Sequence, residues 1–96
     1  MTGQHKENFQ NLRDMLRQVA AEMDCNIVPD RSNRAHSVYF ELIPNGCAYG
    51  PRVRINDAQM KDGHYMDKFI AEQPEVLKLA IKQRLALQKE MEAEDL

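Results

Sequence analysis

Four arginines in the middle of the chain are the residues best suited to binding chemistry. Arg31 and Arg34 precede a segment that contains one acid, Glu41, and Arg52 and Arg54 follow it. Guanidinium groups bind phosphates or carboxylates through paired hydrogen bonds, and nearby aromatic rings can stack on bases. His36 and Tyr49 are also near in sequence. We predict a binding surface made of Arg31, Arg34, Tyr39, Arg52 and Arg54.

Residues 37–43 and 52–56 must position these side chains, and both segments alternate apolar and polar residues. That period of two predicts two antiparallel strands, and Asn45-Gly46 favours a turn after the first strand. Residues 47–49 could extend the second strand. One sheet face would carry Val38, Phe40, Leu42, Val53 and Ile55. The other would carry Tyr39, Glu41, Arg52 and Arg54, and we expect this face to be open to solvent.

An amphipathic helix precedes the strands. Its apolar residues recur at spacings of three and four, and they are Phe9, Leu12, Met15, Leu16, Val19, Ala20 and Met23. We expect the helix to end near Asp24, because residues 26–29 are typical of the start of a strand. Residues 29–36 are rich in Pro, Asp, Ser and Asn, which predicts a loop.

Helices are predicted after the strands. Asn56 or Asp57 can cap a short helix that runs through Met60, and Asp62-Gly63 would end it. Residues 67–73 predict a second short helix, and Pro74 suits the first position of a final helix. The apolar positions of that final helix cover nearly half its circumference, with Arg84 and Gln88 among them. Such a wide arc indicates either a deep groove in its own domain or a partner helix, so we predict a two-fold homodimer through Leu77, Ile81 and Leu85.

The chain of 96 residues predicts one domain spanning residues 1–96. The order of elements predicts an α+β fold. It would have an N-terminal helix, a two- to three-stranded antiparallel sheet, and C-terminal helices packed on one sheet face. The first residues are polar and contain no apolar segment, so we expect no signal peptide. No apolar run approaches the ~18 residues that a membrane span needs. We therefore expect a cytoplasmic protein without a membrane partner.

Catalytic and metal motifs are not evident in the sequence. His5, His36 and His64 lack the spacing of a metal site. Cys25 and Cys47 fit neither a zinc knuckle nor a redox motif. Two reduced thiols are expected, although the spacing alone leaves one disulfide open. We predict a non-enzymatic protein that needs no cofactor or metal.

Residues 36–57 loosely resemble the sheet of a double-stranded RNA-binding domain. The matching residues are His36, Phe40, Asn45-Gly46 and Tyr49-Gly50. That family binds phosphates through a lysine cluster that opens its last helix. Residues 58–62 read Ala-Gln-Met-Lys-Asp instead, so the resemblance does not imply duplex binding here.

A second resemblance covers residues 8–57. The order of segments here resembles the pattern of small accessory proteins of phages and prophages. The matching segments are the amphipathic first helix, Ser37-Val38-Tyr39-Phe40 and Val53-Arg54-Ile55-Asn56-Asp57. The order helix, sheet, helix is also similar to that of some anti-CRISPR proteins. This resemblance implies a non-enzymatic protein that binds a host or phage macromolecule, and we expect a phage-type accessory or inhibitor protein that acts on a host or phage protein.

Two hypotheses follow for the arginine surface. The first is protein–protein interaction, in which Tyr and Arg are common hot-spot residues. The alternative is nucleic-acid or nucleotide binding by the same arginines. Four acids between residues 90 and 96 would repel a phosphate backbone, which favours the first hypothesis. Salt separates the two, because phosphate binding weakens steeply as salt rises.

Overall fold

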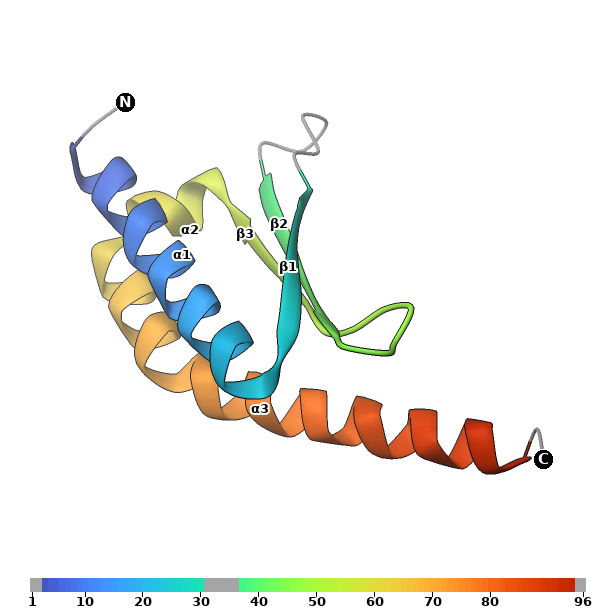
Figure 1. The fold of residues 1–96 in the computed structure, drawn as a ribbon. Helices are drawn as coiled ribbons and strands as arrows, with labels where there is room; N and C mark the ends of the chain where they lie inside the picture. The colour runs from blue at the N-terminus through green and yellow to red at the C-terminus, as the bar shows by residue number, and fades with distance from the viewer. Residues whose placement is uncertain (1–2, 31–36, 95–96) are drawn as a thin grey trace.

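The computed structural model describes residues 3–30 and 37–94 and has the predicted α+β architecture (Figure 1). A helix leads into a three-stranded sheet, and two further helices follow. The elements are α1 (Gly3–Met23), β1 (Cys25–Asp30), β2 (Ser37–Pro44), β3 (Arg52–Asn56), α2 (Asp57–Lys61) and α3 (Gly63–Glu94).

The sheet is antiparallel throughout, in the order β1-β2-β3. Residues 26–29 were predicted to start a strand, and β1 confirms this. The prediction that a loop already begins at residue 29 is wrong, because residues 29 and 30 both belong to β1. β1 is an edge strand, where a proline can lie with its missing N–H away from the ladder. The other predicted loop residues, 31–36, lie outside the described part of the chain.

The predicted alternation of β2 and β3 is confirmed. Phe40, Leu42, Val53 and Ile55 are buried, whereas Arg52 and Arg54 are exposed. The buried side chains meet the apolar stripe of α1, with the ring centroids of Phe9 and Phe40 6.2 Å apart. Figure 1 shows α1 and α3 on the same side of the sheet. The core therefore lies between the helices and one sheet face.

The turn from α1 into β1 ends the first helix where the sequence predicts it. Asp24 has a φ of 54°, a left-handed conformation that commonly closes a helix. Its carbonyl oxygen accepts a hydrogen bond of 3.0 Å from the backbone N–H of Asn45. This bond ties the end of α1 to the turn after β2.

The connection between β2 and β3 is a loop. Residues 47–49 do not extend the strand, and β3 begins at Arg52. A Cβ atom at Gly50 would lie 1.8 Å from the carbonyl oxygen of Leu42, so only glycine fits where the loop crosses β2. The backbone N–H of Leu42 in turn donates to the carbonyl oxygen of Pro51 at 2.9 Å.

The last helices confirm one prediction and correct another. Asn56 caps α2, with reciprocal hydrogen bonds to Gln59 that form a capping box. A separate helix over residues 67–73 is wrong, because α3 runs from Gly63 to Glu94 with Pro74 inside it. A proline removes one intrahelical hydrogen bond and bends a helix without ending it. Figure 1 shows α3 bending part-way along its length, and its red end extends away from the sheet.

Candidate functional site

The face of the sheet turned away from the helices carries Tyr39, Arg52 and Arg54, three of the five residues predicted for the binding surface. Strand register places Tyr39 opposite Arg54 and Glu41 opposite Arg52. Directly paired residues share a sheet face. On the other side of β2, Val28 lies opposite Glu41. We call this surface the outer face, and its described side chains include Asn26, Val28, Tyr39, Glu41, Ile43, Arg52 and Arg54.

Cross-strand contacts organise the centre of the outer face. The guanidinium carbon of Arg54 lies 5.3 Å from the ring centroid of Tyr39, a cation–π distance. Nε of Arg52 lies 3.6 Å from Oε2 of Glu41. The Arg52 side chain is 72% exposed, so this ion pair adds little stability. Its main consequence is electrostatic, because Glu41 offsets one of the two arginine charges.

Apolar atoms lie beside these charges. Val28 is 43% exposed on β1, and Ile43 on β2 is half-buried. The outer face therefore combines an aromatic ring, aliphatic groups, arginines and a carboxylate. This composition matches the mixed character of protein interfaces, where Tyr and Arg are enriched.

The structure places the other predicted site residues elsewhere. Arg31 and Arg34 lie outside the described residues. Leu77 and Ile81, predicted to form a dimer interface, are 4% and 0% exposed, and Leu85 packs partly buried against the same core. These three side chains fill the monomer core because α1 and the sheet cover that side of α3. The large apolar residues that α3 does expose are Val76, Leu79, Leu87 and Met91.

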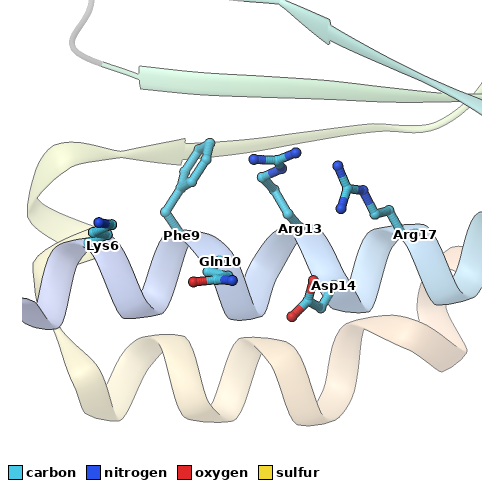
Figure 2. Close-up of a pocket in the computed structure, with 6 residues that line it drawn as sticks. All are labelled: Lys6, Phe9, Gln10, Arg13, Asp14 and Arg17. Carbon is cyan, nitrogen blue, oxygen red and sulfur yellow. The ribbon is translucent and has the colours of Figure 1, made fainter.

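A second basic feature was missed from the sequence. Lys6, Arg13 and Arg17 line a surface pocket of about 270 Å³ on α1, together with Phe9, Gln10 and Asp14. Figure 2 shows the side chains of Phe9, Arg13 and Arg17 extending from α1 on the side of the strands. The guanidinium carbon of Arg13 lies 5.8 Å from the Phe9 ring centroid.

Helical spacing could have revealed this pocket. Residues 6, 13 and 17 differ by seven and four positions, which places them on one stripe of a helix. We call Lys6, Arg13 and Arg17 the α1 basic stripe. None of the ion pairs between described residues includes a member of this stripe. Asp14, which lines the same pocket, reduces its positive potential.

A third cationic group, Arg84, lies on α3 beside the β2–β3 loop. Its Nε–H donates to the carbonyl oxygen of Tyr49 at 3.2 Å, and its guanidinium carbon is 3.8 Å from the Tyr49 ring centroid. Only 8% of Arg84 is exposed. The sequence showed Arg84 among apolar positions of its helix but gave no sign of Tyr49 as its partner.

The thiols are free in the structure. Burial raises the pKa of Cys25 above its ordinary value of 9.0, and the nearby Asp24 carboxylate and the Cys47 sulfur raise it further. At neutral pH, Cys25 is therefore protonated and a poor nucleophile. Within residues 3–30 and 37–94, no three His, Cys, Asp or Glu side chains are grouped to hold a metal ion.

No protein-family model, curated protein or solved structure matches this chain. Function is therefore inferred from the contacts described above. No helix in the described part of the chain has the length and apolarity to cross a membrane.

Proposed function

We propose that the protein binds another protein through the outer face, with Tyr39 and Arg54 at the centre of the contact. The observation that carries this proposal is the Tyr39–Arg54 pair on an uncovered sheet face, flanked by exposed Val28. Burial of a Tyr–Arg pair under a partner would strengthen its cation–π attraction, because water no longer competes for the guanidinium.

Charge balance favours a protein partner over a phosphate backbone. Glu41 contacts Arg52, so the described outer face has two arginines and one carboxylate. A nucleic-acid backbone requires clustered cations to replace its counterions. The outer face does not offer such a cluster, whereas a protein partner can complement both signs.

The resemblance to phage accessory proteins suggests the class of partner. It would be a host or phage protein whose activity is blocked or modified by binding, without any chemical step on this chain. We keep the role of phage-type accessory or inhibitor protein as part of this proposal.

The test is affinity capture from the cells in which the protein acts, with four immobilised proteins. They are the wild type, Tyr39→Ala, Arg54→Ala and Arg17→Ala, the last being a matched control that removes the same charge from α1. We expect a partner that binds the wild type and Arg17→Ala, that is lost at least about tenfold in both outer-face variants, and that persists at 0.5 M salt. A partner retained by both outer-face variants would refute the proposal.

A second candidate function is nucleic-acid or nucleotide binding, and the α1 basic stripe is the observation that favours it. Its three cations face one pocket, and Phe9 could contact a base. It ranks below protein binding because Asp14 borders that pocket. Gel shifts with single- and double-stranded DNA and RNA at low salt test it. We expect no shift at micromolar protein, and a shift lost in Arg17→Ala would establish the second function.

A further inference from the structure

Arg84 has a charge that the described part of the chain does not neutralise. Its hydrogen-bond acceptors are the backbone carbonyl of Tyr49 and Oε1 of Gln88, which accepts from Nη2 at 3.1 Å. Both acceptors are uncharged. Nη1 is buried and has no hydrogen-bond partner among the described residues, and no ion pair between these residues includes Arg84. A buried cation left in this state is costly, and such a group calls for an explanation.

The loop that covers Arg84 is fixed at both of its ends. On one side the backbone N–H of Asn45 is bound to Asp24. On the other side the backbone N–H of Gly50 donates to Oε2 of Glu41 at 3.1 Å, and Gly50 packs against the Leu42 carbonyl. The backbone of Tyr49 is thereby held over α3. Tyr49 itself is 49% exposed, so its side chain borders solvent although it contacts Arg84.

We propose that Arg84, Gln88 and Tyr49 form a binding site for a carboxylate carried by an acidic side chain of a partner polypeptide. The two Nη atoms of Arg84 would bind the carboxylate as a fork, and the Tyr49 ring would swing aside as a cover. Nη2 would exchange the amide oxygen of Gln88 for a charged acceptor, and Nη1 would gain a partner.

The surroundings select a carboxylate over a phosphate. The groups that Arg84 contacts directly are neutral, and the Glu92 carboxylate accepts from Gln88 and not from Arg84, so one negative charge from a ligand balances the guanidinium. A phosphate group carries about −1.5 to −2 at neutral pH, and the excess would be buried without a second cation. Apart from Arg84 itself, no described Lys or Arg is hydrogen-bonded or ion-paired to Arg84, Gln88 or Glu92.

Exposed apolar residues indicate that the carboxylate belongs to a polypeptide. Leu87 follows Arg84 by three positions, and Met91 follows Leu87 by four, which places them on adjoining parts of the helix surface. Both are nearly half exposed. An acidic residue flanked by apolar residues would satisfy Arg84 and cover these side chains together. The site lies outside the outer face, so it does not depend on the function proposed above.

The test uses NMR on the full chain, following the Nε–H signal of Arg84 and the backbone amide of Tyr49 at constant ionic strength. The probes are sodium acetate, sodium phosphate, acetyl-Leu-Glu-Leu-amide and acetyl-Leu-Gln-Leu-amide. We expect saturable shifts with acetate and with the glutamate tripeptide, which should bind about tenfold tighter because it also buries leucine surface. The glutamine tripeptide and phosphate should leave both signals in place.

Three other NMR results would contradict the proposal, in part or as a whole. Equal shifts with phosphate overturn the selection of carboxylate, and equal affinity for acetate and the tripeptide overturns the polypeptide ligand. No shift with any probe overturns the whole site. Normal probe binding by Tyr39→Ala would show that this site and the outer face are separate, so either proposal can fail alone.

Variants distinguish ligand binding from a purely structural role. Arg84→Lys keeps the charge without the fork and should weaken tripeptide binding at least about tenfold. Arg84→Met should abolish binding and unfold at the same or a higher urea concentration, because an unmet buried charge is replaced by an apolar chain. A large fall in the urea midpoint of Arg84→Met would show that Arg84 serves packing. Tyr49→Ala should bind acetate more tightly, and weaker acetate binding by this variant would exclude Tyr49 as a cover over Arg84.

Discussion

Two tyrosine–arginine pairs in this molecule have opposite arrangements of burial. On the outer face, Arg54 is exposed above a half-buried Tyr39. Beside α3, Arg84 is buried beneath a half-exposed Tyr49. In the first pair the arginine is hydrated and can reach a partner directly. In the second pair the arginine has lost its water, and its ring partner must move before a ligand can enter. The same two residue types thus form an open contact surface in one place and a covered charge in the other.

The largest expected effect comes from a substitution in the loop that holds Tyr49, because it would disrupt the Tyr49–Arg84 contact. Gly50→Ala places a methyl group 1.8 Å from the Leu42 carbonyl oxygen, and backbone must shift to accommodate it. We expect unfolding in urea to show a loss of about 3 kcal/mol. Tyr49 should also leave Arg84, while the outer face keeps its register.

Gly46→Ala is the matched control for that variant. A Cβ atom there meets nothing within 4 Å, although the φ of 88° is strained for alanine. A loss of about 1 kcal/mol is expected. If both variants lost the same free energy, backbone strain and not the contact with Leu42 would explain the role of Gly50.

A smaller effect is expected in the coupling free energy between tyrosine and arginine, which should differ between the two pairs. Double-mutant cycles with Tyr→Leu and Arg→Met substitutions measure each coupling free energy. We expect about 2 kcal/mol for Tyr49–Arg84, because the guanidinium is desolvated, and about 0.5 kcal/mol for the exposed Tyr39–Arg54 pair. The readout is the free energy of unfolding in urea. Equal couplings would mean that burial does not distinguish the pairs.

The sequence placed Tyr39 and Arg54 on one sheet face but did not relate Tyr49 to Arg84, and the reason is physical. Tyr39 and Arg54 lie on strands whose period of two assigns each side chain to a face, and the strand order then places them opposite each other. Tyr49 lies in an irregular loop, where no period relates it to Arg84. Only the three-dimensional path of that loop, set by Gly50, brings the ring to α3.

The same distinction between local periodicity and the three-dimensional path of the chain explains which other structural predictions were right and which were wrong. The stripe of α1, the α2 cap and the alternation of β2 and β3 depend on local spacing, and the sequence predicted each of them. The continuity of α3 through Pro74 runs against local helix propensity, and α3 packs against α1. In that packing Leu77 and Ile81 face the interior, so these two residues, which were predicted for a dimer interface, lie in the core. Self-association itself stays a prediction.

Alkaline pH should weaken contacts outside the two pairs, because arginine keeps its charge throughout this range. Nζ of Lys78 on α3 lies 2.7 Å from Oε2 of Glu22 on α1. That hydrogen bond raises the pKa of Lys78 above its ordinary value of 10.5, and burial raises the pKa of Cys25 above 9.0. The folded state therefore holds both protons more tightly than the unfolded chain does.

The contribution of both groups is complete below about pH 9 and is lost as pH rises through the folded pKa values. We expect Tm to fall between pH 9 and pH 11. Glu22→Gln should flatten the part of this fall above pH 10, and Cys25→Ala the part near pH 9. A profile that is identical in both variants and the wild type would exclude these groups as the cause.

The smallest effect is expected at Glu41, which joins the two regions. Its carboxylate contacts Arg52 on the outer face and accepts the Gly50 N–H in the loop that holds Tyr49. Glu41→Gln removes the charge but keeps an acceptor, so we expect a loss below about 0.5 kcal/mol. Glu41→Ala removes both, and a loss of about 1 kcal/mol should follow because the Gly50 N–H loses its partner. If Glu41→Gln is as damaging as Glu41→Ala in urea unfolding, the ion pair with exposed Arg52 stabilises the fold. The arginines of the outer face would then be committed to internal contacts, which would weaken the case for a partner on that face.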